Sequence, residues 1–384
     1  MIMRVLYIFR SIAQWGGIER ILVDKMNYLS DVYGVDVFFL TYDQGSHSQT
    51  FKLSDNIHYE DLNICFHRQY KYSLLKRMFV LFDMRRKYKF LLSDRLCKIC
   101  PDLIVTTTSD HLDIIIKVKG SVPLIVESHS ICIRTINTYD NWVLRRIFRK
   151  MFLNCLSKAD AVVALTESDA DEWRKYHSNV VVIPNFVHSH KNCISELTSK
   201  NVLFVGRFDY QKRVQDAILI WKMVRERHPD YLLHIYGEGE MHDEITHLAS
   251  SVGGIVVHQP TNRIFNAYQN SSILISTSLF EPFGLVIPEA MSCGVPVVAF
   301  DCNYGPSEFI TENSNGFLIK DRDYQTFADR VCDLIESEFL RKKMGKVARC
   351  NAEKYDLFTI MPMWMCFFSS FISTIKKDDL DDGC

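Results

Sequence analysis

The chain lacks the long apolar run that a membrane-spanning helix requires. None of its segments reaches the roughly 18 uninterrupted apolar residues needed to cross a bilayer. The nearest approach, residues 360–375, contains Pro362 and three serines, and we expect it to form an amphipathic C-terminal helix. The N-terminal stretch MIMRVLYIF is short and has no small-residue cleavage site behind it. We therefore expect neither a transmembrane segment nor a secretory signal.

Low-complexity tracts and short-period repeats are also missing, which argues against solenoid and disordered proteins. Apolar residues make up 47% of the chain and charged residues 24%, an ordinary balance for a globular protein. A length of 384 residues, at roughly 100–200 residues per domain, predicts two domains. We expect no nucleic acid among the partners of this chain.

Paired cysteine motifs are scarce although the chain contains twelve cysteines. The cysteines are scattered singly, so reduced thiols and a cytoplasmic location are expected. Cys97 and Cys100 form a CxxC pair without a second pair or a nearby histidine set, and this predicts no metal site. Asp169 and Asp171 form a D-x-D, but they lie in a stretch that is expected to be helical. We therefore predict a protein without a metal.

Positive charge is concentrated in the first half of the chain. Residues 68–95 carry nine basic residues and two acids, Asp83 and Asp94, interleaved with aromatic and aliphatic residues. This pattern suits a basic amphipathic helix on an anionic membrane surface, which would make the protein peripheral to the inner face of the cell membrane. The alternative is a solvated helix whose apolar face packs on its own domain. The sequence leaves both readings open.

Short apolar strands alternate with helical segments in the second half, residues 191–357. This alternation predicts a parallel sheet covered on both faces, as in a doubly wound α/β domain. The expected strands are 201–205, 232–236, 255–258, 273–276 and 296–300, and the expected helices are 213–227, 241–250, 262–269 and 286–293.

The first half, residues 1–190, alternates less cleanly but also predicts a Rossmann-like domain. The expected strands are 5–9, 35–40, 103–106, 124–127 and 161–165, with a helix over 18–29. We place the domain boundary between Phe186 and Lys200, where the chain is polar and lacks hydrophobic period. Residues 358–384 are expected to form a C-terminal helix that crosses back to the first domain, followed by an acidic tail. Ligands of two such domains bind at the carboxyl ends of the strands, so we expect a site in the cleft between them.

The most informative segment is EPFGLVIPEAMSCGVP, which begins at Glu281 and ends at Pro296. Glu281 follows an expected strand, and Glu289 lies about one turn into the next helix. Gly284 allows the backbone to approach a ligand and leaves N–H groups free at the helix start, where Leu285 follows. A carboxylate can accept hydrogen bonds from two vicinal hydroxyl groups. Glu289 therefore suits a ribose, and Glu281 suits a sugar ring.

This segment resembles the E-x7-E signature of the retaining glycosyltransferase family 4, also called glycosyl transferases group 1, whose fold is GT-B. The resemblance extends from Gly16 to about Phe327. Further motifs that carry it are GGIER at 16–20, ESHS at 127–130, IPN at 183–185, GRFDYQKR at 206–213, YGEGE at 236–240, NYGPSEFI at 303–310 and NGFLI at 315–319.

The resemblance implies roles for individual residues. Arg207 and Lys212 match the pair that binds the donor diphosphate, and fixed cations there stabilise the departing charge. Gly16 and Gly17 match the glycine-rich first loop, which faces phosphate or sugar. His129 matches a histidine that faces the transferred sugar. The predicted catalytic set consists of Glu281, His129, Arg207 and Lys212. The predicted donor-binding set consists of Gly16, Gly17, Arg207, Lys212, Gly284, Leu285 and Glu289.

The implied reaction moves a hexose or N-acetylhexosamine from a nucleotide sugar with retention of anomeric configuration, without a cofactor or metal. The expected donor is a UDP-sugar, and the expected acceptor is a lipid-linked saccharide of a bacterial surface polysaccharide (capsule, lipopolysaccharide or exopolysaccharide). A GDP-mannose-dependent mannosyltransferase and a non-catalytic binding subunit stay open as alternatives. A nicotinamide-dependent oxidoreductase is disfavoured because GEGE at 237–240 lacks the third glycine of the dinucleotide fingerprint.

Overall fold

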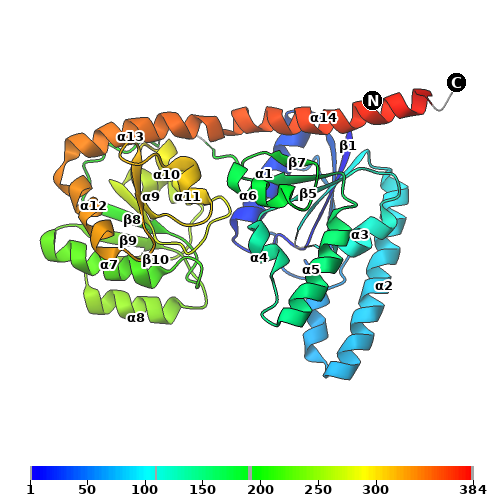
Figure 1. Ribbon diagram of the computed structural model, residues 1–384, viewed down its shortest axis with the longest axis horizontal. Coiled ribbons are helices and arrows are strands. Elements are labelled where there is room, and N and C mark those ends of the chain that lie inside the picture. The colour runs from blue at the N-terminus through cyan, green and yellow to red at the C-terminus, as the bar shows by residue number, and fades with distance from the viewer. Residues whose placement is uncertain (1, 109, 189–192, 382–384) are drawn as a thin grey trace. The chain divides into compact units, whose positions relative to one another are not determined.

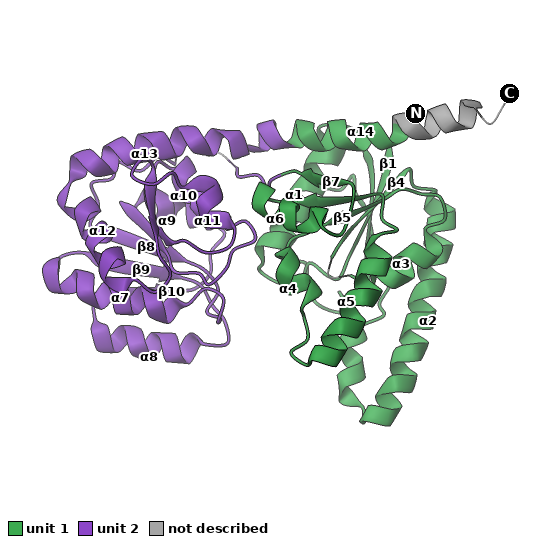
Figure 2. Cartoon of the chain, in the orientation of Figure 1, with its two compact units in different colours: residues 1–183, 361–384 green, residues 184–360 purple. Residues whose placement is uncertain are grey.

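The computed structural model describes residues 2–108, 110–188 and 193–381 and divides the chain into two compact units. Unit 1 comprises residues 1–183 and 361–384, and unit 2 comprises residues 184–360, as Figure 2 shows. The division falls after Ile183, a few residues before the polar segment in which the sequence placed the boundary. Residues 189–192 of that segment and residues 382–384 of the acidic tail lie outside the described residues.

Unit 1 is built on a seven-stranded parallel sheet (Figure 1). Its order is β3-β2-β1-β4-β5-β6-β7, so the direction of strand addition reverses between β1 and β4. The strands are Arg4–Phe9 (β1), Asp36–Thr41 (β2), His58–Asp61 (β3), Leu103–Thr107 (β4), Leu124–Glu127 (β5), Ala161–Ala164 (β6) and Val180–Val182 (β7).

Helices and one 3-10 turn connect the strands of unit 1. They are Gly17–Asp31 (α1), Phe66–Lys71 (η1), Leu74–Ile99 (α2), Leu112–Val118 (α3), Cys132–Ile136 (α4), Trp142–Leu156 (α5) and Glu167–Arg174 (α6). Helix α3 packs against both α2 and α5. The core lies between these helices and the sheet, where Trp173 and Tyr88 are among the largest fully buried side chains.

Unit 2 is built on a six-stranded parallel sheet with the order β10-β9-β8-β11-β12-β13. Its strands are Asn201–Val205 (β8), Leu232–Tyr236 (β9), Ile255–His258 (β10), Ile273–Ser276 (β11), Val297–Phe300 (β12) and Gly316–Ile319 (β13). The helices are Val214–Arg227 (α7), His242–Val252 (α8), Ile264–Gln269 (α9), Val286–Ser292 (α10), Gly305–Phe309 (α11), Tyr324–Glu336 (α12) and Glu338–Ala352 (α13), followed by the 3-10 turn Glu353–Tyr355 (η2).

The last helix, Leu357–Asp381 (α14), starts in unit 2 and continues in unit 1. Trp364 and Phe368 are buried along it. The crossing of the C-terminal helix back to the first domain was predicted and is confirmed. Among the described residues, no helix combines the length and the hydropathy that crossing a bilayer would require.

The two parallel-sheet α/β domains confirm the predicted fold class, and every strand expected from the sequence is present within one residue at either end. The prediction missed β3 and β7, the two edge strands of the first sheet, and β13, an edge strand of the second sheet. Neither β3 nor β7 contains a buried residue. The sequence of β3, HYED, has no apolar run, which explains why this strand was missed. The sequences of β7 (VVV) and β13 (GFLI) are apolar, so a signal was present for both of them.

Candidate functional site

Of the predicted donor-binding residues, Gly16 and Gly17 lie in unit 1, and the other five lie at one edge of the unit 2 sheet. The loop at residues 206–213 follows β8, and the loop at residues 277–285 follows β11, its neighbour in the sheet. The strand order reverses between these two strands, and ligands of doubly wound sheets bind at the carboxyl ends of the strands at such a point. The first loop carries Arg207 and Lys212, and the second carries Glu281 and Gly284.

Hydrogen bonds join these two loops directly. The backbone N–H of Leu279 donates to the carbonyl of Gln211 at 2.8 Å. The Gln211 side chain donates to the carbonyl of Phe280 at 3.1 Å. The Thr277 hydroxyl donates to the carbonyl of Arg213 at 2.8 Å. The loops are therefore held as one platform instead of as two independent segments.

A buried ion pair lies at the centre of this platform. Lys212 Nζ pairs with Glu281 Oε1, and the two side chains are 14% and 4% exposed. The Ser278 hydroxyl donates to the same carboxylate oxygen at 2.6 Å. The side chain of Asp209 accepts from the backbone N–H of Lys212 at 3.0 Å and so fixes the turn that presents the lysine. An ammonium group has three donors, so Lys212 can bind a ligand oxygen and keep Glu281.

The loop around Glu281 is fixed from its other side by the segment that follows β12. Its backbone N–H donates to the carbonyl of Asn303, and its carbonyl accepts from the N–H groups of Tyr304 and Gly305, all at 2.9 Å. Gly284 has φ +81°, a left-handed conformation that favours glycine. The backbone therefore holds Glu281 in place independently of its ion pair.

Arg207 lies in the same loop as Lys212 but points into solvent, with a side chain that is 62% exposed. Its Nη2 atom is 3.1 Å from Asp209 Oδ2 and donates to Gln211 Oε1 at 3.2 Å. The structure therefore brings Lys212 and Glu281 into direct contact and places Arg207 beside them as an exposed cation.

Two glycines of the YGEGE motif let a second loop pack closely on this platform. A Cβ atom at Gly237 would lie 1.9 Å from the carbonyl oxygen of Gly206, and one at Gly239 would lie 2.4 Å from that of Phe208. The Phe208 N–H donates to the carbonyl of Glu238 at 2.9 Å. Glycine is required at both positions because any side chain would separate the two loops.

The second glutamate of the motif, Glu289, lies in the first turn of α10 and is buried. Its Oε2 accepts a hydrogen bond from the Tyr268 hydroxyl of α9 at 2.8 Å. The sequence did not point to Tyr268. Leu285 is the residue that precedes α10, and Gly284 comes directly before it.

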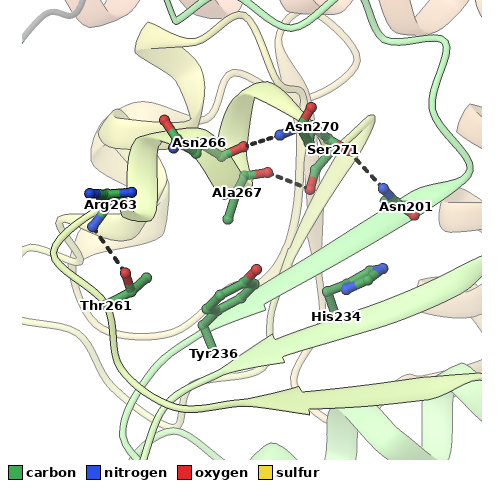
Figure 3. Close-up of a pocket in the computed structure, with 9 residues that line it drawn as sticks. All are labelled: Asn201, His234, Tyr236, Thr261, Arg263, Asn266, Ala267, Asn270 and Ser271. Atoms are coloured by element: carbon green, nitrogen blue, oxygen red, sulfur yellow. Dashed lines mark hydrogen bonds between the residues drawn. The ribbon is translucent and has the colours of Figure 1, made fainter.

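A cavity of about 280 Å³ lies between α9 and the strands β8 and β9. Figure 3 shows the Tyr236 and His234 side chains on the strand side, with Asn266 of α9 and Asn270, which directly follows α9, opposite them. The Tyr236 ring stacks on His258 of β10 with 4.2 Å between ring centroids. The cavity therefore combines a flat aromatic surface with amide groups.

In unit 1, the predicted glycine-rich loop leads from β1 into α1. Gly16 precedes the helix, and Gly17 is its first residue. A Cβ atom at Gly16 would lie 2.0 Å from a carboxylate oxygen of Glu19, which folds back over the helix start. A side chain at position 16 would therefore displace the Glu19 carboxylate from the helix start.

His129 follows β5, and its side chain is buried. Its Nε2 atom is 2.9 Å from Glu127 Oε2. The other carboxylate oxygen of Glu127 accepts from Lys25 Nζ of α1 at 2.5 Å, where both side chains are at most 2% exposed. Burial would raise the pKa of the Glu127 carboxyl, but Lys25 and His129 outweigh it and hold that pKa below its usual value.

The prediction missed Lys25. A helix with buried residues three or four positions apart signals its core-facing stripe, and Lys25 lies on that stripe with Ile21, Leu22, Met26 and Leu29. A lysine at such a position was the available signal.

Asp169 and Cys100, from the two motifs that the sequence analysis set aside as metal sites, make hydrogen bonds within the protein. Asp169 lies in α6, as predicted, and its carboxylate accepts from the backbone N–H of Cys132 at 2.8 Å and from Trp173 Nε1 at 3.0 Å. The Cys100 thiol donates to the carbonyl of Cys97. Within the described part of the chain, no group of three or more histidine, cysteine, aspartate or glutamate residues could hold a metal ion.

Comparisons with known proteins agree with the motifs. Residues 189–350 match the family described as Glycosyl transferases group 1, and residues 15–191 match the one described as Glycosyltransferase Family 4. The chain belongs to this glycosyltransferase family. The resemblance inferred from the sequence is thereby confirmed, and the two matched segments together contain all the predicted site residues of this family 4 glycosyltransferase.

The chain is 30% identical to poly(ribitol-phosphate) α-N-acetylglucosaminyltransferase of Staphylococcus aureus over 244 residues, which are 61% of this chain and 50% of the relative. It therefore spans about half the length of that relative. It is 25% identical to an uncharacterised glycosyltransferase of Haemophilus influenzae over 366 residues, 93% of this chain and 98% of the relative.

A solved structure of a mutant of Staphylococcus aureus TarM, in complex with fondaparinux, α-GlcNAc-glycerol and UDP, superposes with a TM-score of 0.75. The likeness covers 96% of this chain and 100% of that one at 17% identity. At this identity it shows the fold, which is GT-B as predicted.

Proposed function

We propose that the protein transfers a sugar from a nucleotide-sugar donor to a glycan acceptor and that unit 2 binds the donor. The observation that carries this proposal is that two cations and two acids lie at the same edge of the unit 2 sheet. Two cations, Arg207 and Lys212, follow β8, while two acids, Glu281 and Glu289, follow β11, and the strand order reverses between these strands. Cations for a diphosphate and acids for hydroxyl groups are the two chemistries that a nucleotide sugar requires.

In this proposal the donor diphosphate lies against Arg207 and Lys212. Arg207 is exposed and can bind phosphate oxygens with two parallel hydrogen bonds. Lys212 is fixed by Glu281 and acts as a point charge. Both stabilise the negative charge that develops as the nucleoside diphosphate departs.

The acids and the backbone orient the rest of the donor. Glu281 would accept from hydroxyl groups of the transferred sugar, and Glu289 would accept from the ribose. The N–H groups at Gly284 and Leu285 precede α10 and can donate to ligand oxygens. The Tyr236 ring in the cavity beside α9 offers a flat surface on which the base can stack. Tyr236 is close to the proposed diphosphate site because the next residue, Gly237, packs against Gly206 of the loop that carries Arg207 and Lys212.

Unit 1 would supply the acceptor side, with His129 facing the transferred sugar and the loop at Gly16 and Gly17 facing sugar or phosphate. We propose retention of anomeric configuration by front-side attack, in which the leaving phosphate accepts the proton of the acceptor. No protein nucleophile is required. We also propose that the reaction needs no metal ion, because fixed cations take the role of neutralising the diphosphate; full activity in excess EDTA is the expected result.

We propose a UDP-hexose or UDP-N-acetylhexosamine as donor and a saccharide of a bacterial surface polysaccharide, carried on a lipid, as acceptor. The name of the Staphylococcus aureus relative, an N-acetylglucosaminyltransferase that acts on poly(ribitol phosphate), supports this class. A panel of UDP- and GDP-sugars assayed by nucleotide release tests it. UDP-sugar turnover that Glu281→Ala abolishes supports the proposal. Turnover of GDP-mannose alone would show that the donor is GDP-mannose and not a UDP-sugar. Binding without turnover would favour a non-catalytic subunit.

We further propose that unit 1 docks on an anionic membrane surface, as expected for a lipid-linked acceptor at the inner face of the cell membrane. No residue of α2 before Tyr88 is buried. Large apolar side chains on α2 and α5 are exposed, and basic residues lie among them. The exposed apolar residues are Leu74, Leu75, Met78, Phe79, Phe82 and Phe90 on α2 and Trp142, Val143, Leu144, Ile147 and Met151 on α5.

Helix α5 extends the surface that the sequence indicated at residues 68–95. It contains Arg145, Arg146, Arg149 and Lys150 and no acidic residue. Both helices pack on α3, and Figure 1 shows α2 and α5 projecting from the same side of the unit 1 sheet. An apolar strip with interleaved cations matches the chemistry of an anionic lipid surface.

Sedimentation with vesicles tests the docking proposal. Wild-type protein is expected to sediment with phosphatidylglycerol vesicles, less so at high salt, and the change Phe79→Ser with Phe82→Ser is expected to weaken binding. Phe339→Ser is the matched control, because Phe339 lies in unit 2 and is as exposed as Phe79. Equal binding to neutral vesicles, or an equal effect of the control, would contradict the proposal.

A further inference from the structure

A buried charged cluster in unit 1 links the C-terminal helix to His129. Lys25 of α1, Glu127 of β5 and Trp364 of α14 are each at most 3% exposed. Lys25 Nζ lies 2.5 Å from Glu127 Oε1 and 3.8 Å from the centroid of the Trp364 ring. Tyr7 of β1 presents a second aromatic face to the same ammonium group at 5.6 Å. The lysine is thus enclosed by one carboxylate and two rings.

This lysine is costly to the fold and needs an explanation. It occupies a position on the apolar stripe of α1 where leucine or methionine would pack without desolvating a charge. Buried ion pairs are often no more stabilising than apolar side chains of similar volume. The cluster is therefore better explained by what it does to its neighbour His129 than by its contribution to stability.

The cluster fixes which nitrogen of His129 carries hydrogen. Glu127 is ionised and can only accept, so the ring must donate from Nε2, 2.9 Å from Glu127 Oε2. In the neutral ring, Nδ1 then carries a lone pair. Nδ1 is buried and has no hydrogen-bond partner among the described residues. A buried acceptor of this kind is rare in folded proteins and points to a ligand that donates to it.

We propose that Lys25 and Glu127 are positioning residues that hold His129 in the Nε2–H tautomer, so that Nδ1 accepts a hydrogen bond from a hydroxyl group of the bound sugar. Trp364 of α14 completes the enclosure of Lys25. This inference rests on the proposed function, because it needs His129 to meet the sugar.

Each member has a separate part in this arrangement. Glu127 accepts from the ring and orients it. Lys25 keeps Glu127 ionised, because a buried carboxyl without a cation would take up a proton and could then donate to the ring instead. Such a proton would allow the opposite tautomer, in which Nδ1 donates and cannot accept a hydroxyl hydrogen. Trp364 adds a cation–π contact that excludes water from the ammonium group.

Nitrogen NMR of the full chain, labelled with ¹⁵N-histidine, reads the tautomer without depending on activity. His129 resonances are assigned with His129→Gln. Wild-type protein is expected to show a protonated Nε2 and an unprotonated Nδ1. The double variant Lys25→Met with Glu127→Gln removes both charges together, so no unpaired buried charge threatens folding. It is expected to mix the two tautomers.

Kinetics of the same variants test the consequence for transfer. The double variant is expected to lower kcat at least tenfold and to leave the donor KM within about twofold. Lys119→Met is the matched control, because Lys119 is a largely buried lysine of unit 1 that pairs with Asp160. It removes an ion pair away from His129 and should change neither kcat nor the tautomer.

The outcomes distinguish the control of the His129 tautomer by Lys25 and Glu127 from the role of His129 in sugar binding. An unchanged His129 tautomer in the double variant would overturn the positioning role of Lys25 and Glu127. A changed tautomer with wild-type kcat in both the double variant and His129→Gln would sustain the tautomer control but remove His129 from the reaction. That second result would contradict the proposed role of His129 and overturn this inference as a statement about sugar binding.

Discussion

Replacing Lys212 with methionine is expected to lower both the free energy of unfolding and kcat, for two different reasons, and each loss can be measured independently. The change removes the cation from a Glu281 carboxylate that is 4% exposed and leaves it the Ser278 hydroxyl. Breaking a buried ion pair by removing one partner costs about 3–5 kcal/mol. Because Lys212 is itself 14% exposed, some water reaches the pair, and we expect about 3 kcal/mol, the lower end of that range.

Catalysis should fall for a different reason. A fixed donor at a developing negative charge contributes a factor of about 10²–10³ to kcat. Lys212→Met is therefore expected to lower kcat by about that factor under conditions where the variant is fully folded. Urea denaturation followed by fluorescence gives the stability change, and nucleotide release gives kcat.

A double-mutant cycle supplies the control. Glu281→Gln added to Lys212→Met removes the unpaired charge and should recover about 2 kcal/mol of the lost stability, a normal coupling for residues in contact, without recovering kcat. Lys200→Met breaks the solvent-exposed pair with Asp230 and should change neither quantity measurably. Additive stability losses in the double variant would refute the buried pair. Wild-type kcat in Lys212→Met would refute the role of its charge.

Three further predictions concern neighbouring features. Gly237→Ala should destabilise unit 2 by about 2 kcal/mol in urea, because its Cβ would lie 1.9 Å from the Gly206 carbonyl oxygen; a neutral effect would contradict the close approach. Tyr268→Phe should cost about 2 kcal/mol, since it removes a buried hydrogen bond to the Glu289 carboxylate; a loss below 0.5 kcal/mol, roughly the low end for any hydrogen bond, would count against that bond. Burial raises the pKa of Asp169 to about 6. The folded state therefore holds this proton after the unfolded chain has released it, and the associated stability, complete below about pH 4, is lost as pH rises through about 6. Relative to Asp169→Asn, the wild type should lose about 3 kcal/mol between pH 4 and pH 7 in urea denaturation, whereas a constant difference would show an ordinary carboxyl.

Much of the fold was predictable because the central strands are buried on both faces. Segments such as 202–205 and 273–275 are continuous apolar runs, and this is the pattern that a parallel sheet imposes. The edge strand His58–Asp61 carries no such run and was missed. The short helix at 305–309 was also missed, because five residues are too few to show a period.

The place of the site residues along the fold was predictable, but their contacts were not. The sequence placed Arg207 and Lys212 after the strand at 201–205 and Glu281 after the strand at 273–276. That these two strands are neighbours is known only from the structure. Nothing in the spacing indicated that Lys212 would pair with Glu281 and that Arg207 would point to solvent, because side-chain direction depends on the turn between them. Tyr268 and Lys25 were missed because their partners lie 21 and 102 residues away along the chain.

The exposed apolar surface on α2 and α5 was likewise only partly predictable from the sequence. Residues 68–95 were noticed because basic residues are dense there, whereas α5 escaped notice because its apolar residues could equally have faced a core. The structure distinguishes these cases because Trp142 and Met151 are exposed while Phe152 is buried. Burial is a property of the fold and cannot be read from one helix alone.

Calorimetric titration of UDP and GDP into the full chain tests the central claim most directly, because it asks whether unit 2 binds a nucleoside diphosphate through Arg207 and Lys212. We predict saturable binding of one molecule per chain, with UDP preferred. We predict that the change Arg207→Ala with Lys212→Met weakens it at least a hundredfold, and that Lys200→Met leaves it unchanged. Absence of binding by either nucleotide, or equal affinity in the wild type and the double variant, would contradict the account.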